Sequence, residues 1–123
     1  MSRKKKVLVI DDNDDVLRLV EDTLGKSAYE CITAQSAIEG LEKAAQEMPQ
    51  LILLDLMLPK MSGLGFMREI KSHPELKKIP VVAFTTLGDE DIANEVMALG
   101  AVGFLRKACG SHELISMIDN YAA

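Results

Sequence analysis

Tryptophan is absent from this chain, and cysteine and histidine occur only twice each. The two cysteines, Cys31 and Cys109, form no C-x-x-C motif, so we expect reduced thiols in an intracellular protein rather than a disulfide framework. No apolar run approaches the roughly 18 residues of a membrane-spanning helix, and the charged N-terminus lacks the apolar segment of a secretory signal. These absences predict a cytoplasmic protein that does not act at a membrane.

Positive charge is also scarce, with 14 lysines and arginines against 19 aspartates and glutamates. The net charge of -5 argues against direct binding to nucleic acid. The one basic run, residues 3–6, precedes an apolar run, and we interpret it as the solvated start of a strand. A length of 123 residues with 48% hydrophobic side chains fits a single domain, residues 1–123, with a substantial core.

Five short apolar runs, each followed by a segment of helical periodicity, organise the chain. We predict strands at 6–10, 30–34, 51–54, 81–84 and 102–106. Strict alternation of this kind is typical of an α/β fold, a doubly wound parallel sheet with helices on both faces. Ligands of such sheets bind beyond the carboxyl ends of the strands, which for the strand order 2-1-3-4-5 means between strands one and three.

The second predicted helix has clear start and stop signals. Ser36 followed by Glu39 is a capping box, and Pro49 ends the helix. The helical periodicity predicts a core-facing side made of Ile38, Leu41, Ala45 and Met48.

Polar residues follow four of the predicted strands: the pair Asp11 and Asp12, then Asp55, Thr85 and Lys107. Because the carboxyl ends of parallel strands meet at one edge of a sheet, we expect these side chains to form one site. Three close carboxylates repel one another unless a cation relieves the repulsion. Mg²⁺ suits such a site, since it takes oxygen ligands and usually combines one or two carboxylates with phosphate oxygens.

Asp55 is the best candidate nucleophile, because it stands alone at a strand end before a loop that should leave it accessible. Lys107 can pair with a phosphoryl oxygen, and the Thr85 hydroxyl can donate to another. Each residue also has an ordinary interpretation: Asp12 or Asn13 as a helix cap, Thr85 as a strand end, and Lys107 as a surface lysine. Their joint placement at successive strand ends favours the site.

These motifs resemble the receiver domain of two-component response regulators over essentially the whole chain, in the single-domain form similar to chemotaxis regulators. The matching segments are V-L-V-I-D-D at 7–12, L-I-L-L-D-L-M-L-P-K-M-S-G at 51–63, I-P-V-V-A-F-T-T at 79–86 and G-F-L-R-K at 103–107. The resemblance implies a flavodoxin-like sheet of order 2-1-3-4-5 and a Mg²⁺-dependent switch. It implies a signalling protein rather than an enzyme, although one that can assist its own phosphorylation and dephosphorylation.

By position in these motifs, the resemblance implies that Asp55 is the phosphoacceptor and a metal ligand. Asp12 would be a direct ligand of Mg²⁺, Asp11 would act on it largely through water, and the carbonyl of Met57 would complete the protein ligands. Lys107 would be the lysine of the phosphoryl site.

The resemblance also implies partners. A sensor histidine kinase or phosphotransfer protein would donate the phosphoryl group to Asp55. Thr85 would be the switch hydroxyl and Phe104 the aromatic switch residue, and together they would change the face made by the fourth helix, fifth strand and fifth helix. That face would control binding to a downstream target protein or the formation of a phosphorylation-dependent homodimer.

One residue departs from the family pattern, which usually has proline after the lysine, often with a cis bond. Here the residue is Ala108. A cis bond before a residue other than proline costs about 3–4 kcal/mol, so we predict a trans Lys107–Ala108 bond and a loop shifted from the usual course.

Two apolar residues, Met57 and Leu87, occupy positions where the family varies its dephosphorylation rate. Neither can orient an attacking water, so we expect a long-lived acyl phosphate. Two alternatives stay open. One is a degenerate receiver that binds partners without phosphorylation, supported only by Ala108. The other is a Mg²⁺-dependent aspartyl phosphatase, which is disfavoured because such enzymes carry D-x-D rather than adjacent acids.

Overall fold

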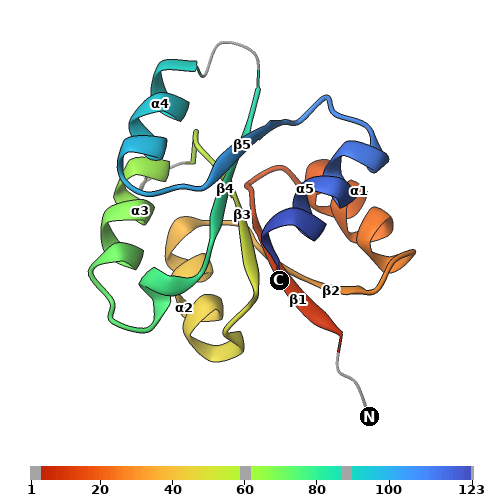
Figure 1. The fold of residues 1–123 in the computed structure, drawn as a ribbon, viewed down its shortest axis with the longest axis horizontal. Helices are drawn as coiled ribbons and strands as arrows, with labels where there is room; N and C mark the ends of the chain where they lie inside the picture. Colours follow the sequence, from red (N-terminus) through yellow and green to blue (C-terminus); the bar gives the residue numbers. More distant parts are fainter. Residues whose placement is uncertain (1–3, 59–61, 87–89, 123) are drawn as a thin grey trace.

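The computed structural model describes residues 4–58, 62–86 and 90–122, and within them strands and helices alternate as predicted (Figure 1). The elements are β1 Lys5–Ile10, α1 Asp14–Gly25, β2 Tyr29–Ala34, α2 Ala37–Glu47, β3 Leu51–Asp55, α3 Gly63–Lys71, the short 3-10 helix η1 Leu76–Lys78, β4 Val81–Thr85, α4 Glu90–Ala98, β5 Gly103–Arg106 and α5 Ser111–Tyr121. None of the helices in these ranges has the length and apolar character needed to cross a bilayer.

The five strands form one parallel sheet in the order β2-β1-β3-β4-β5, which confirms the predicted doubly wound topology. Helices α1 and α5 cover one face, and α2, α3 and α4 cover the other (Figure 1). Both faces of the central strands are therefore buried, which explains why β1, β3 and β4 appear in the sequence as continuous apolar runs rather than alternating ones.

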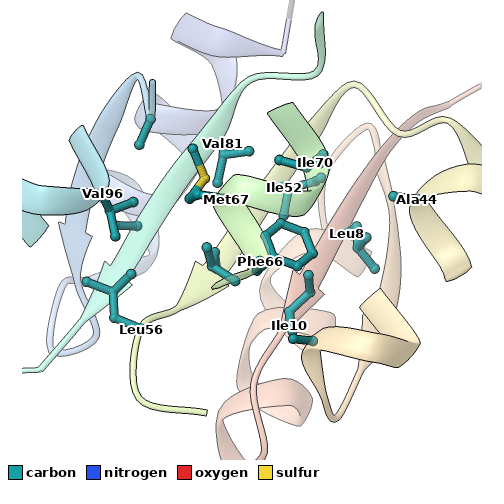
Figure 2. Packing of buried hydrophobic residues seen from close by; sticks show 14 of the residues in the cluster. Leu8, Ile10, Ala44, Ile52, Leu56, Phe66, Met67, Ile70, Val81 and Val96 are labelled. Carbon is teal, nitrogen blue, oxygen red and sulfur yellow. The ribbon is translucent and has the colours of Figure 1, made fainter. Parts of the chain in front are cut away.

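Alternate residues along each strand supply the two cores. In β1, Leu8 and Ile10 pack with α2 and α3 around Phe66, as Figure 2 shows, whereas Val7 and Val9 face α1 and α5. Cys31 packs against the second of these cores and, like Cys109, is a free thiol. The sheet is therefore held rigidly from both sides, which fixes where its strand ends lie.

Side chains cap the helices that begin near these strand ends. The Asn13 side chain accepts hydrogen bonds from the backbone N–H groups of Asp15 and Val16 at 2.9 and 3.3 Å, so Asn13 rather than Asp12 caps α1. Ser36 caps α2 by accepting from the Glu39 N–H, while the Glu39 carboxylate accepts from the N–H of Gln35 at 2.7 Å. The predicted start of α2 is thus correct, and Asp12 is left available for another role.

The predicted core-facing side of α2 is wrong. Ile38 is 53% exposed, and Ala45 and Met48 also face solvent; only Leu41 is half-buried against the core. The true buried residues of α2 are Ala37, Gly40 and Ala44.

Close packing of α2 on β1 explains the difference. A Cβ atom on Gly40 would lie 2.4 Å from Cδ1 and 2.9 Å from Cγ1 of Ile10, which is itself fully buried. Helix and strand approach each other so closely that only small residues fit between them. A pattern search that follows large apolar residues therefore selects the wrong side of this helix.

We expect Gly40→Ala to lower the free energy of unfolding by about 1 kcal/mol, because overpacking costs of about 1–3 kcal/mol exceed the helix propensity gained over glycine. Gly25→Ala is the matched control, since no atom lies within 4 Å of the added methyl group. It should be neutral or slightly stabilising. Urea unfolding of both variants tests this, and equal stabilities would contradict the close contact of α2 with β1.

Candidate functional site

Three carboxylates gather where β1 and β3 end. Oxygen atoms of Asp11, Asp12 and Asp55 all lie within 4.8 Å of one another. Asp11 and Asp12 directly follow β1, and Asp55 is the last residue of β3. Strands β1 and β3 are hydrogen-bonded neighbours, so the strand order itself brings together acids that are far apart in the chain.

The burial of the three acids differs. Asp11 is fully buried and Asp55 is only 4% exposed, whereas Asp12 faces solvent. The expectation that Asp55 stands open before a loop is therefore wrong, because its side chain lies between neighbouring groups. Asp55 Oδ1 accepts a hydrogen bond from the backbone N–H of Met57 at 3.3 Å, and Asp11 Oδ1 accepts one from the N–H of Asn13 at 2.9 Å.

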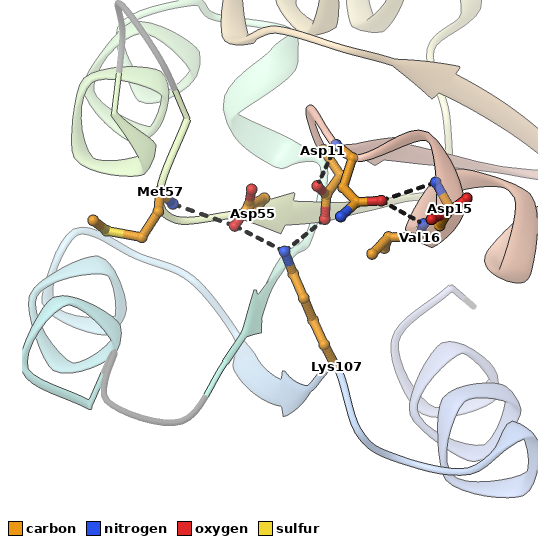
Figure 3. Close-up of polar contacts among 7 residues, drawn as sticks. Asp11, Asp15, Val16, Asp55, Met57 and Lys107 are labelled. Atoms are coloured by element: carbon orange, nitrogen blue, oxygen red, sulfur yellow. Dashed lines mark hydrogen bonds and ion pairs between the residues drawn. The ribbon is translucent and has the colours of Figure 1, made fainter.

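Lys107 reaches this cluster from the end of β5. Its Nζ atom lies 2.7 Å from Asp11 Oδ2 and 3.2 Å from Asp55 Oδ1, and the side chain is only 16% exposed (Figure 3). The backbone N–H of Lys107 donates to the carbonyl of Thr85 at 2.7 Å, which anchors the residue to β4. Within the described residues no peptide bond is cis, so the Lys107–Ala108 bond is trans as predicted.

The charges of the site leave a net excess of acid. Burial raises the pKa of Asp55, and the negative charge of Asp11 adds to this, while Lys107 and the Met57 N–H act in the opposite direction. Burial alone would lower the pKa of Lys107, but its close contacts with Asp11 and Asp55 outweigh burial and raise that pKa instead. Lys107 is therefore firmly cationic, yet one positive charge faces three carboxyl groups.

The donor set fits a hard divalent cation. Asp11 Oδ2 is buried and, among the described residues, receives no well-aligned hydrogen bond, although Lys107 Nζ lies close to it. An under-satisfied carboxylate oxygen, an exposed carboxylate on Asp12 and a third on Asp55 offer only oxygen ligands. Such a set matches the preference of Mg²⁺ for oxygen and for sites that keep one side open to water and phosphate.

Thr85 and Phe104 line a pocket whose walls include none of the three acids. Thr85 is the buried last residue of β4, and Phe104 in β5 is 48% exposed. Both line a pocket of about 190 Å³ together with Thr86, Ala93, Asn94 and Arg106. The Met57 side chain is exposed, and Leu87 lies outside the described residues.

Two residues of the site have roles that sequence reasoning missed. The sequence predicts Asn13 as a possible cap of α1, but not its second role, in which its backbone N–H donates to Asp11 Oδ1. Phe84 lies beneath Lys107, with the ring centroid 6.0 Å from Nζ. Nothing in the apolar run Val81–Phe84 distinguishes this ring from a simple core residue.

The fold and the site together define a class: a doubly wound α/β domain whose sheet ends in an acid cluster paired with one partly buried lysine. Comparison with known proteins gives the family. The model of the response regulator receiver domain matches residues 7–119, and the chain belongs to this family.

Relatives and solved structures agree with this assignment. The chain is 32% identical over 117 residues to the polar-differentiation response regulator DivK of Brucella ovis, covering 95% of each protein. A receiver domain protein from Clostridium thermocellum has a TM-score of 0.88 at 32% identity, covering 96% of this chain and 94% of that one. The chemotaxis protein CheY4 of Vibrio cholerae has a TM-score of 0.88 at 29% identity, covering 95% and 98%. The predicted flavodoxin-like fold and receiver resemblance are thereby confirmed.

The raised pKa of Asp55 predicts that Asp55→Asn stabilises the metal-free protein at neutral pH. A carboxyl whose pKa is raised by folding destabilises the fold once ionised, so the stability of the wild type falls as pH rises through that pKa. The advantage of the variant should therefore be present above the raised pKa and vanish below the ordinary value of 3.8. Urea unfolding across this range measures it.

Asp22→Asn makes the same change of charge at an exposed position on α1 and should change stability little at any pH. A loss of stability in Asp55→Asn at neutral pH would show that the Lys107 ion pair outweighs the cost of burying Asp55.

Proposed function

We propose that this receiver domain is a phosphorylation switch in which Asp55 accepts a phosphoryl group from a sensor histidine kinase, a phosphotransfer protein or a small phosphodonor. The observation that carries the proposal is the Lys107 ammonium 3.2 Å from Asp55 Oδ1, inside a cluster that contains two further carboxylates. A nucleophilic carboxylate beside a fixed cation and a metal-ligand set is suited to phosphoryl transfer.

The transfer converts Asp55 into an acyl phosphate. An oxygen of the Asp55 carboxylate attacks phosphorus, and the new P–O bond forms as the P–N bond to the imidazole of the donor breaks. The imidazole leaves after taking up a proton. Lys107 already lies beside the attacking carboxylate, so its ammonium can pair with a phosphoryl oxygen without a large movement.

Asp12, Asp55 and the carbonyl of Met57 would hold Mg²⁺, with Asp11 acting on it through water. When bound, the ion neutralises charge on the phosphoryl oxygens. The exposure of Asp12 supports its role as a direct ligand, because an ion held there can also keep water ligands.

Output would begin at Thr85. Its hydroxyl would turn toward the phosphoryl group, and the exposed Phe104 ring would move into the pocket of about 190 Å³ that both residues line. The face formed by α4, β5 and α5 would then change its affinity for a downstream target or a second copy of this chain. Such a switch couples a local change of charge to a two-state element.

The degenerate receiver and the phosphatase have no comparable support. Ala108 was the only reason to doubt the placement of Lys107, and the lysine contacts both acids although the following bond is trans. Asp12 and Asp14 do form a D-x-D sequence, but Asp14 is the first residue of α1, accepts a hydrogen bond from the Gln35 side chain and does not belong to the acid cluster.

Incubation with acetyl phosphate and Mg²⁺ should add the mass of one phosphoryl group, mapped by peptide analysis to Asp55. Asp55→Asn should abolish the addition, and Asp22→Asn should leave it intact. Wild-type protein that binds a partner but stays unmodified under these conditions would favour the degenerate receiver, and sustained hydrolysis of phosphate esters would favour the phosphatase.

Because Met57 and Leu87 offer no group to orient water, the phosphorylated protein should persist after the phosphodonor is removed. A half-life of seconds would contradict this.

Mg²⁺ should raise the free energy of unfolding of the wild type, since an ion that binds only the folded protein stabilises it by mass action. Asp12→Asn should weaken Mg²⁺ binding about 10-fold or more, because changes even to outer-shell partners of metal ligands have effects of this size. Titration calorimetry checks this with Asp22→Asn as the control. Equal affinities in the wild type and Asp12→Asn would remove Asp12 from the ligand set.

A further inference from the structure

A buried aromatic ring lies beneath the lysine of the site. The Lys107 Nζ atom is 6.0 Å from the centroid of the Phe84 ring, and Phe84 is 4% exposed. Phe84 directly precedes Thr85 in β4 and belongs to the core between the sheet and helices α1 and α5. Phe84 is the register partner of Asp55 where β3 pairs with β4, so the ring lies beside the strand end that carries the phosphoacceptor.

We propose that Phe84 is a positioning residue that holds the Lys107 ammonium against Asp55, and thereby sets the rate at which Asp55 is phosphorylated. This inference rests on the proposed function of Asp55.

The Lys107 side chain is held at its backbone and at its ammonium group, and the Phe84 ring lies beside the stem between these two points. The backbone of Lys107 is fixed to the Thr85 carbonyl at 2.7 Å, and the ammonium is fixed by ion pairs to Asp11 and Asp55. The flexible stem in between has four methylene groups. The loop is closed by a hydrogen bond from the Cys109 N–H to the Arg106 carbonyl at 3.0 Å, which restrains the backbone but not the stem.

Open space adjoins the lysine on the side of the ring. Phe84 and Lys107 line one pocket of about 150 Å³, whose remaining walls come from α1, the start of α5 and the loop before it: Leu19, Val20, Thr23, Cys109, Gly110, Ser111 and Leu114. A smaller residue at position 84 would enlarge this space beside the stem. The ammonium would then have more conformations available in which it leaves Asp55.

The electrostatics of the ring act in the same direction. A cation within about 6 Å of an aromatic face is attracted to it, and burial of both groups reduces screening by water. Attraction to the Phe84 ring is therefore suited to keep the Lys107 ammonium near Asp55, at the distance of 3.2 Å between Nζ and Oδ1.

The test compares Phe84→Leu with Phe66→Leu. Phe66 is fully buried in the core on the opposite face of the sheet, so the same truncation there destabilises the fold without touching the lysine. Phe84→Leu should slow phosphorylation of Asp55 by acetyl phosphate about 10-fold, within the range that small misplacements of reacting groups cause, while Mg²⁺ affinity is unchanged. Phe66→Leu should keep the wild-type rate under conditions where both variants are folded, and Phe84→Tyr, which retains the ring, should keep most of it.

Nuclear magnetic resonance of the unphosphorylated wild type gives a readout that depends neither on phosphorylation nor on a variant folding. The ε-methylene protons of Lys107 should show cross-peaks to the Phe84 ring and a ring-current shift, and Phe84→Leu should remove that shift. A rate within two-fold of the wild type in Phe84→Leu, equal losses in Phe84→Leu and Phe66→Leu, or absent cross-peaks would overturn the inference. If the wild type accepts no phosphoryl group at all, the proposed function is overturned instead. The cross-peaks would still show whether Lys107 contacts the Phe84 ring.

Discussion

The ion pairs of Lys107 with Asp11 and Asp55 are the interaction on which the rest of the site depends. Two carboxylates buried at neighbouring strand ends would repel each other strongly in a medium of low polarity, and the ammonium is the only described cation in direct contact with them. The compensation is incomplete, because Asp12 adds a third acid. The described residues are thus left with a local excess of negative charge, which the Mg²⁺ that we propose would relieve.

Strand order and close packing make this arrangement rigid. Acids from β1 and β3 meet because these strands are neighbours, and the lysine arrives from β5 through a backbone hydrogen bond to β4. The central strands β1, β3 and β4 lie between two layers of helices, and on one side α2 approaches β1 so closely that a Cβ atom on Gly40 would clash with Ile10. A strand end held in this way cannot shift without disturbing both cores, so the distances between the charged groups are properties of the whole fold.

The sequence was sufficient to predict the alternation of elements, the parallel sheet and the gathering of Asp11, Asp12, Asp55, Thr85 and Lys107, because apolar runs and the residues after them encode these features directly. Three features could not be predicted from the sequence, each for a physical reason. The buried side of α2 consists of small residues, since closeness rather than size determines the packing there. Asp55 is buried because groups remote in sequence cover it. The relation of Phe84 to Lys107 depends on the register of β4 with β5, which no local pattern reveals.

Neighbouring residues at the end of β4 face opposite sides of the sheet. Phe84 belongs to the core under α1 and α5 and adjoins the lysine, whereas Thr85 lines the pocket shared with Phe104 and α4. One peptide bond therefore separates the residue that we propose sets the rate of phosphorylation from the residue that we propose begins the response to it. If both proposals hold, substitutions on one side of the sheet would change the rate of phosphorylation, and substitutions on the other side would change which partner is bound. Related domains could then evolve a new response time without changing their partners, and new partners without changing their response time.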